Sequence, residues 1–307
     1  MQVPFSYQGG KFNIAKKICD LIPRHTVYVE PYFGSGAVFF RKRYPLISNN
    51  HHYREVLNDL NSDIYNFFRV LRDRGEELKL KCELTPYSRE EYKICKDREN
   101  CDDLERARRF YISANISFGG KLDSGFGRSI YGKNNPLSLI NKTNLLLDFS
   151  KRLRLAYIEN VDAIECIKRW DSPQTFFYCD PPYPETNQDG YKHKYTIFDF
   201  EKLIDVLDSC VGSFILSSYD NGYYPKNSER FELDTICHIS GKGKTFRDGG
   251  DKNSKPTQES MGNRKRKEIL YVRGSRIDVR KEIQILYDKG LYDSFYDSFY
   301  DLIESDY

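Results

Sequence analysis

The sequence lacks the features of a membrane, secreted or zinc-binding protein. No apolar stretch approaches the roughly 18 residues that cross a bilayer, and residues 1–5 have no signal-peptide pattern. The eight cysteines are scattered singly, with no C-x-x-C pair and no histidine spaced to complete a zinc site. We therefore expect a cytoplasmic protein with reduced, mostly structural cysteines and no metal.

Excess charge of one sign is also missing, because 48 lysines and arginines nearly balance 45 acids and leave a net charge of +3. Aromatic residues are abundant by contrast. The 24 tyrosines and 20 phenylalanines, in a chain that is 39% hydrophobic, indicate a globular protein rather than a disordered one. A length of 307 residues allows one large domain or two unequal ones.

The first informative pattern is a strand, a glycine loop and a helix. Residues 26–30 are predicted to form a buried strand, Pro31-Tyr32-Phe33-Gly34-Ser35-Gly36 a loop, and the residues from Ala37 a helix. This is the first unit of a doubly wound α/β sheet, in which loop glycines let a cofactor approach the backbone closely. A lone Gly-x-Gly is as often a plain tight turn, so the loop needs support from other motifs.

Two further polar positions favour a nucleotide-type cofactor. Asp59 ends the next predicted strand, roughly 20 residues after the loop, where a carboxylate is typical of a ribose-hydroxyl acceptor. It can instead cap the helix expected near Ser62. Upstream, Gly9-Gly10-Lys11 opens a helix predicted to end near Leu21, and this turn can hold a cofactor carboxylate or remain a solvated surface turn. It lacks the G-x-x-x-x-G-K-[ST] pattern of a nucleoside-triphosphate loop.

The strongest candidate for chemistry is Asp180-Pro181-Pro182-Tyr183, which follows the apolar run 175–179 and therefore marks the carboxyl end of a buried strand. The prolines fix φ and remove two N–H donors, so carbonyl oxygens, the Asp180 carboxylate and the Tyr183 ring are oriented to hold a planar amine. The same tetrapeptide is also a common strand ending. Asp162, after a predicted strand at 155–160, is either a cofactor contact or the cap of the next helix.

Together these motifs resemble the Dam-type DNA adenine methyltransferases. The resemblance covers residues 5 to about 273 and rests on four stretches in one order: Tyr7-x-Gly9-Gly10-Lys11, Val29-Glu30-Pro31-Tyr32-Phe33-Gly34-Ser35-Gly36-Ala37-Val38-Phe39, Asn58-Asp59 and Tyr178-Cys179-Asp180-Pro181-Pro182-Tyr183. Family members usually have tryptophan where Tyr7 stands and often phenylalanine where Tyr32 stands. Both changes keep an aromatic ring.

The resemblance implies an enzyme that uses S-adenosylmethionine. Tyr7 and Lys11 would contact the methionine part, Asp59 the ribose, and Asp180 would lie between the cofactor and the target base. The expected cofactor contacts are Tyr7, Lys11, Glu30, Pro31, Gly34, Ser35, Gly36, Asp59, Asp162 and Asp180, and the expected catalytic residues are Asp180, Pro181, Pro182 and Tyr183.

The resemblance also implies a Rossmann-like, doubly wound methyltransferase sheet with a DNA-recognition insertion. We assign residues 1–61 and 156–273 to the S-adenosylmethionine-binding catalytic domain and residues 62–155 to a mostly helical target-recognition domain. Residues 274–307, which repeat Tyr-Asp-Ser-Phe in tandem, form an appended tail with no assignable role.

Candidate DNA contacts lie in three segments: the glycine- and aromatic-rich loop of the insertion, the polar loop after Tyr183, and residues 241–267. The last segment holds nine lysines and arginines against three acids, which favours a basic arm on DNA phosphates over an inert disordered segment. The candidates are Lys121, Arg128, Tyr191, Lys194, Tyr195, Lys242 and Lys244.

The expected reaction is methylation of adenine N6 in double-stranded DNA, possible only after the base is flipped out of the duplex. Asp180 and the Pro181 carbonyl would each accept an amine hydrogen while Tyr183 stacks on the base, and methyl transfer would be direct. Cytosine N4 or an RNA amine also fits the motif, and a non-catalytic DNA-binding module that kept the fold is a third alternative. The resemblance suggests a GATC-like site and a monomer, and leaves restriction-modification, phage and orphan roles open.

Overall fold

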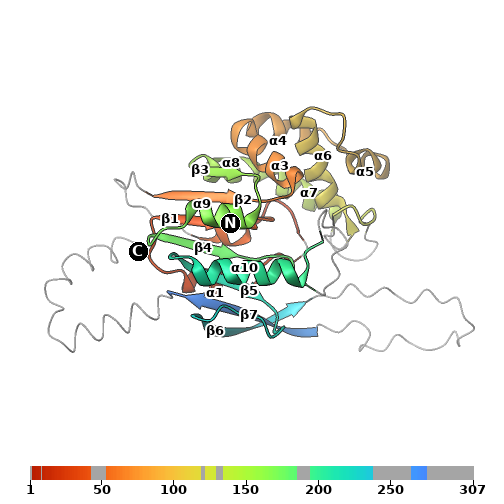
Figure 1. Ribbon diagram of the computed structural model, residues 1–307. Helices are drawn as coiled ribbons and strands as arrows, with labels where there is room; N and C mark the ends of the chain where they lie inside the picture. Colours follow the sequence, from red (N-terminus) through yellow and green to blue (C-terminus); the bar gives the residue numbers. More distant parts are fainter. Residues whose placement is uncertain are drawn as a thin grey trace, which may run out of the picture.

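The computed structural model describes residues 2–7, 9–42, 53–118, 122–128, 134–184, 194–237 and 264–274. Seven strands form one sheet in the order β3-β2-β1-β4-β5-β7-β6 (Figure 1). Strands β1 to β5 are parallel, and β7 is antiparallel to β5 and β6. The bounds are β1 Val27–Glu30, β2 Arg54–Asn58, β3 Ala156–Glu159, β4 Thr175–Cys179, β5 Ser213–Ser218, β6 Glu229–Cys237 and β7 Arg264–Arg273. The predicted α/β, doubly wound sheet is confirmed.

Helices connect the strands, and several begin where a side chain caps the first turn. Thr196 and Asp199 form a reciprocal capping box at the start of α10, and Asn61 caps α3 by accepting from the Asp63 N–H. In the described part of the chain the helices are α1 Ala15–Leu21, α2 Ala37–Arg41, α3 Ser62–Asp73, α4 Gly75–Glu83, α5 Arg89–Lys96, α6 Asp103–Ile116, α7 Asn135–Asn144, α8 Leu146–Leu153, α9 Ala163–Trp170 and α10 Ile197–Ser209.

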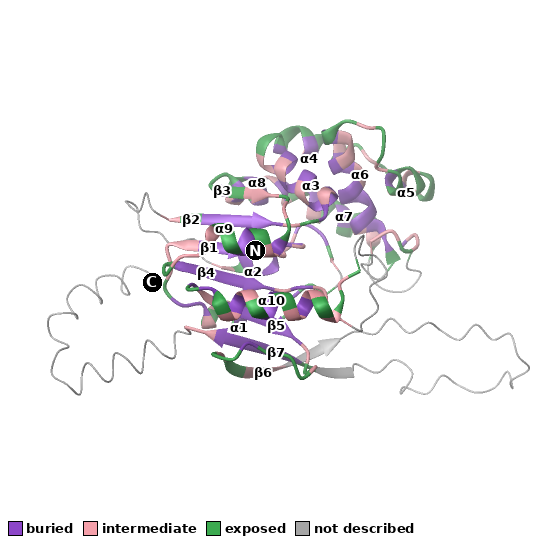
Figure 2. Ribbon diagram, in the orientation of Figure 1, coloured by how far each residue is buried: buried purple, intermediate pink, exposed green. Residues whose placement is uncertain are grey.

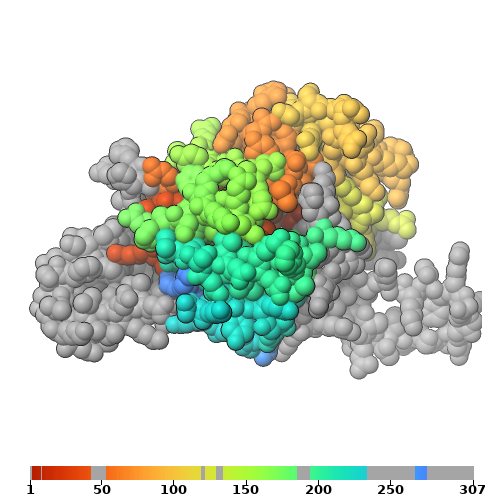
Figure 3. Space-filling view, in the orientation of Figure 1, coloured from red at the N-terminus to blue at the C-terminus, as the bar shows by residue number. Residues whose placement is uncertain are grey.

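The sheet is buried on both faces, as the continuous apolar sequence of β4 requires. Phe176 and Tyr178 pack with α1, α2 and α3 on one face, whereas Phe177 and Cys179 pack with α9 and α10 on the other. The central strands β2, β4 and β5 are accordingly coloured mainly as buried in Figure 2, and α9 and α10 cover the near side of the sheet in Figure 3. The result is a three-layer α/β/α arrangement.

Helices α3 to α8 form the segment expected to recognise DNA, and in Figure 1 they lie beyond the β3 edge of the sheet. They share one hydrophobic cluster with the sheet: Phe67 and Phe68 of α3 and Phe110 of α6 pack around Phe5. The Phe5 and Phe110 rings meet edge to face at 5.0 Å between centroids. The N-terminal segment that leads to Lys11 is therefore anchored between the helical segment and the sheet.

Three details differ from the sequence-based expectations. Helix α1 begins at Ala15 rather than at the glycine turn, because Gly9 adopts φ +78° and Lys11–Ile14 form a separate turn. Strand β6 was missed, although Phe231 and Leu233 alternate there with acidic residues. Strand β7 begins earlier than predicted, so residues 264–267 belong to a strand paired with β6 rather than to a basic loop.

The order of the strands creates a switch point between β1 and β4. The chain moves from β1 outward through β2 to β3, returns to β4, and continues on the other side through β5. In open α/β sheets, ligands bind outside the carboxyl ends of the strands at such a point. The loop after β1 and Asp180 after β4 flank this position, and Asp59 follows β2 beside it.

Candidate active site

Asn58, the last residue of β2, joins the carboxyl ends of three adjacent strands. Its side-chain amide donates to the Pro31 carbonyl at 2.9 Å and to the Val161 carbonyl at 3.0 Å, and its side-chain oxygen accepts from the Val161 N–H at 3.0 Å. Its backbone carbonyl accepts from the Phe33 N–H at 2.9 Å. Because Asn58 is fully buried, these bonds fix the loop after β1 against the sheet edge.

Two glycines of this loop are needed for packing within the protein. Gly34 and Gly36 adopt φ +53° and +69°, the left-handed region that side chains rarely occupy. A Cβ on Gly36 would lie 2.6 Å from the Phe33 ring and 2.9 Å from the Phe40 ring, and a Cβ on Gly34 would lie 3.3 Å from the Tyr7 ring. Gly36 is thus required to fold the loop onto α2, and Gly34 to let the N-terminal segment approach.

The N-terminal turn lies directly against this loop. The Gly10 N–H donates to the Tyr7 carbonyl at 3.1 Å, which closes the turn, and the Tyr7 ring faces Gly34. The Lys11 side chain then extends from the turn, almost completely buried, toward the carboxyl end of β4. Residues near the N-terminus and in the middle of the chain therefore meet at the switch point.

Lys11, Asp180, Tyr183 and Glu268 form a buried polar group that we call the active-site cluster. Lys11 Nζ donates to Asp180 Oδ1 at 2.7 Å and to the Gly9 carbonyl at 2.9 Å, and it lies 3.5 Å from Glu268 Oε1. The Tyr183 hydroxyl shares its single hydrogen between Asp180 Oδ1, at 3.3 Å, and Glu268, to which the hydrogen bond is shorter. One ammonium and one phenol hydroxyl thus serve two carboxylates.

Burial shapes the charges of this cluster. It raises the pKa of Asp180, an effect that the neighbouring Lys11 ammonium only partly opposes. Burial also raises the pKa of Glu268. The Lys11 ammonium opposes this rise, and the Asp180 carboxylate adds to it. For Lys11, burial lowers the pKa, but Asp180 and Glu268 outweigh it, so the pKa is raised overall. Lys11 therefore stays charged, and the two acids compete for it.

Asp59 lies at the same edge, one strand away from the loop after β1. Its two carboxylate oxygens accept the backbone N–H groups of Gly34 and Asn61, each at 2.8 Å. Burial raises its pKa to about 6 despite these bonds. The helix-cap alternative is wrong for Asp59, because Asn61 caps α3.

Two other expected cofactor contacts have clear structural roles. The Glu30 carboxyl is buried, accepts the Tyr28 hydroxyl at 2.5 Å, and has its pKa raised by burial to about 8. Asp162 is exposed and caps α9 by accepting from the Ile164 and Glu165 N–H groups. The helix-cap alternative is confirmed for Asp162, whose position after β3 still adjoins the sheet edge.

The loop expected to contact DNA is braced at its base. The Ser117 and Phe126 backbones form an antiparallel bridge, and the Phe126 ring packs beneath the Arg89 guanidinium and against Tyr87. Arg128, the preferred DNA contact, is exposed to solvent two residues after this bridge.

Of the other predicted DNA contacts, Lys194 and Tyr195 lie in the described part of the chain. Lys194 is exposed. Tyr195 instead packs edge to face against Tyr32, with the two hydroxyls 3.3 Å apart, so it adjoins the loop after β1. Four candidates lie outside the described residues: Lys121, Tyr191, Lys242 and Lys244.

Glu268 and Asn58 were not identified as site residues from the sequence. Glu268 lies on β7, whose antiparallel direction brings its first half to the carboxyl edge of the parallel strands. The available signal was a lone acid directly before the apolar run Ile269-Leu270-Tyr271-Val272, because a charge inside a buried strand needs a partner. For Asn58, the only signal was a polar residue at the end of a predicted strand.

Within the described ranges, no three histidine, cysteine or acidic residues gather closely enough to hold a metal ion. In those same ranges, no helix has both the length and the apolar character needed to cross a membrane.

Comparisons with known proteins agree on one family. Residues 7–236 match the model of the D12 class N6 adenine-specific DNA methyltransferases. The type II methyltransferase M.MjaIII of Methanocaldococcus jannaschii is 25% identical over 80% of this chain and 96% of that protein. The DNA N-6-adenine-methyltransferase of Escherichia phage P1 is 27% identical over 66% of this chain but only 27% of that protein. The DNA adenine methylase of Haemophilus influenzae is 24% identical over 61% of this chain and 68% of that protein.

Proposed function

The chain belongs to the D12 class of N6 adenine-specific DNA methyltransferases, and we propose that its active-site cluster methylates an adenine flipped out of double-stranded DNA. Family membership gives the reaction, N6 methylation of adenine in DNA. The methyl donor, the flipping step, the residue roles and the DNA sequence are the proposed parts.

The state of the Asp180 carboxylate carries the proposal. Oδ1 accepts both Lys11 and Tyr183, whereas Oδ2 accepts no hydrogen bond from any described residue. The side chain is 18% exposed at the switch point of the sheet. An oriented carboxylate with one available oxygen, placed where α/β sheets bind ligands, suits the acceptance of an amine hydrogen.

The residues at this edge fit S-adenosylmethionine as the donor. Each Asp59 oxygen accepts a single backbone N–H, so lone pairs of this partly exposed carboxylate are left for ribose hydroxyls. The turn at Tyr7 and the loop at Gly34 are packed together beside it and supply an aromatic ring and backbone groups. Lys11 directs its donors to Gly9, Asp180 and Glu268, so we assign it to holding Asp180 ionised and oriented.

The chemistry follows from the target amine, whose lone pair is delocalised into the adenine ring. When bound, S-adenosylmethionine supplies a methyl group that its positively charged sulfur makes electrophilic. Asp180 Oδ2 accepts one amine hydrogen and the Pro181 carbonyl the other, which directs the nitrogen lone pair away from the ring. The Tyr183 ring stacks on the base, and Asp180 is placed to receive the proton that the nitrogen loses after methylation.

Recognition of DNA falls to the helical segment and its neighbouring loops. Arg128 and Lys194 are exposed cations suited to phosphate or base contacts, and affinity should therefore fall as salt rises. We propose a GATC-like recognition sequence from the resemblance to Dam-type enzymes.

The test is incubation of the purified chain with S-adenosyl-[methyl-³H]methionine and duplex DNA from a host without DNA methylation. The DNA is then digested to nucleosides and separated by chromatography. We expect label in N6-methyldeoxyadenosine, and sequencing of the modified positions gives the recognition site. Label in N4-methyldeoxycytidine, or label accepted only by RNA, would overturn the proposal. Asp180→Ala, processed in parallel, gives the background.

A further inference from the structure

Glu268 is a buried acid at the active site that the reaction as described does not use. It lies on β7 opposite Leu233 of β6, directly before the residues of β7 that pair with β5. Because side chains alternate along a strand, Glu268 faces the same side as Leu270 and Val272, the side on which the N-terminal segment packs. Its side chain is only 7% exposed.

A carboxylate in this position has to be explained, because burial of an acid is unfavourable without partners of its own. Glu268 shares its cation with Asp180, which lies closer to Lys11: 2.7 Å against 3.5 Å. Its closest partner is instead the Tyr183 hydroxyl, which donates to it in a short hydrogen bond. The feature that is specific to Glu268 is therefore its contact with the tyrosine of the catalytic tetrapeptide.

We propose that Glu268 is a positioning residue that fixes the Tyr183 ring as the stacking surface for the flipped adenine, by holding the Tyr183 hydroxyl. The inference rests on the proposed role of Tyr183. In this proposal Glu268 influences the reaction through the tyrosine rather than by contact with the base.

The contacts around Tyr183 show how such positioning works. The ring has Lys11 Nζ 4.9 Å from its centroid and packs at a steep angle against the Tyr219 ring, with centroids 4.4 Å apart. These contacts hold the body of the ring. The hydroxyl, the atom farthest from the backbone, is held by Glu268 in the shorter of its two hydrogen bonds and by Asp180 Oδ1 at 3.3 Å, so the ring is also restrained at its far end.

The test is a double-mutant cycle on DNA methylation by the full chain, with tritiated S-adenosylmethionine and duplex DNA. Glu268→Ala should lower kcat/KM for DNA about 10- to 100-fold, the range expected for a misplaced substrate, while the Kd for S-adenosylmethionine stays within about two-fold. Glu268→Gln should stay within about three-fold of wild type, because the amide oxygen still accepts the hydroxyl. Tyr183→Phe should lose at least as much as Glu268→Ala, because it also removes the hydroxyl bond to Asp180 Oδ1, and the double variant should lose no more than Tyr183→Phe alone.

Each alternative gives a different result. Equal losses in Glu268→Gln and Glu268→Ala would mean that the charge on Glu268 matters rather than the hydrogen bond, and would overturn the inference. Additive losses in the double variant would also overturn it, because Glu268 would then act through Lys11 or through folding. Glu232→Ala removes an exposed acid from the neighbouring strand and is the matched control, expected to leave both kcat/KM and Tm unchanged.

A separate variant distinguishes failure of the inference from failure of the proposed function. Tyr183→Ala removes the ring itself and should abolish methylation if Tyr183 carries the base. Loss in Tyr183→Ala with none in Glu268→Ala would reject Glu268 alone. Full activity in both would reject the stacking role of Tyr183 and, with it, the basis of the inference.

Discussion

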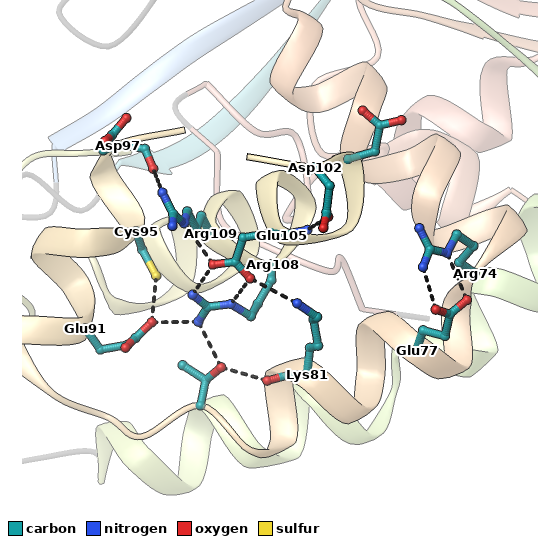
Figure 4. Close-up of polar contacts among 12 residues, drawn as sticks. Arg74, Glu77, Lys81, Glu91, Cys95, Asp97, Asp102, Glu105, Arg108 and Arg109 are labelled. Atoms are coloured by element: carbon teal, nitrogen blue, oxygen red, sulfur yellow. Dashed lines mark hydrogen bonds and ion pairs between the residues drawn. The ribbon is translucent and has the colours of Figure 1, made fainter. Parts of the chain in front are cut away.

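Two ion clusters in this chain are built in opposite ways. In the helical segment, Arg108 of α6 pairs with Glu105 of the same helix and Glu91 of α5, and Lys81 and Arg109 also contact Glu105 (Figure 4). We call these five residues the Arg108 cluster. It has three cations for two carboxylates, whereas the active-site cluster has one cation, Lys11, for the carboxylates of Asp180 and Glu268.

The acids respond accordingly. Hydrogen bonding to Arg108 is the main cause that lowers the pKa of Glu105 to about 2, so its charge is favoured by the fold. Burial raises the pKa of Asp180 and of Glu268, so the fold opposes the ionisation of both acids. An arrangement that opposes ionisation in a cleft is typical of a functional site, and one that favours it is typical of a structural site. Substitutions should therefore separate activity from stability.

Asp180→Ala should have the largest effect, a loss of turnover of about 10³-fold, because the amine then lacks its hydrogen-bond acceptor. Because the change also removes the carboxylate 2.7 Å from the buried Lys11 ammonium, turnover is compared at a temperature where the variant is folded. Binding of S-adenosylmethionine should fall only modestly. Tritium transfer measures turnover, thermal unfolding sets that temperature, and calorimetric titration measures binding. Methylation close to the wild-type rate would contradict the assignment of Asp180.

Arg108→Met should show the converse pattern. It leaves Glu91 without its arginine partner and removes the bidentate contact to Glu105, so the free energy of unfolding should fall by about 2–3 kcal/mol. This loss is smaller than the loss expected when a fully buried ion pair is broken, because the Arg108 side chain is 11% exposed and Glu105 keeps its contacts with Lys81 and Arg109. Urea unfolding measures the loss, and kcat at a temperature where the variant is folded should equal that of wild type.

Stability should change with pH in opposite directions at the two clusters. The lowered pKa of Glu105 contributes stability above its ordinary pKa of 4.5 that is lost as pH falls toward about 2. The pKa of Asp180 is raised in the folded state, so ionisation of this acid at higher pH lowers the free energy of unfolding. This loss of stability disappears as the pH falls below the raised pKa toward the ordinary value of 3.8. On acidification, the stability of wild type should therefore fall relative to Glu105→Gln and rise relative to Asp180→Asn.

The same measurements locate the acid limit of activity. Methylation requires ionised Asp180, so kcat should fall with decreasing pH at a value above 3.8, where the carboxylate takes up a proton. Parallel pH profiles of kcat and of unfolding free energy separate the two effects. A kcat profile that follows the stability profile throughout would show that unfolding, rather than Asp180, sets the acid limit.

The parts of the site that lie within one sequence motif could be predicted from the sequence. The loop 31–36, Asp59 and Asp180-Pro181-Pro182-Tyr183 each follow a buried strand, so local pattern and the sheet rule suffice to bring them to one edge. Lys11 was expected at the cofactor, yet its bond to Asp180 joins residues far apart in the sequence, and no local pattern specifies it.

The contacts that escaped prediction depend on packing between distant elements. Glu268 reaches the site only because β7 runs antiparallel beside β5, a topology that the sequence around residue 268 does not encode. The Tyr195 ring meets Tyr32 because the start of α10, whose Asp199 carbonyl accepts the Tyr195 hydroxyl, lies beside the loop after β1. The Arg108 cluster likewise needs α4, α5 and α6 to pack together before its charges meet.

Lys81→Ala should have the smallest effect, about 0.5 kcal/mol or less of unfolding free energy, with no change in kcat. Lys81 Nζ lies 3.3 Å from Glu105, but its side chain is 42% exposed, so water and salt screen the pair. Urea unfolding of Lys81→Ala and of Arg108→Met, measured in parallel, compares two cations of the same cluster. A loss as large as that of Arg108→Met would mean that the number of cations around Glu105, rather than the burial of one of them, sets the strength of the cluster.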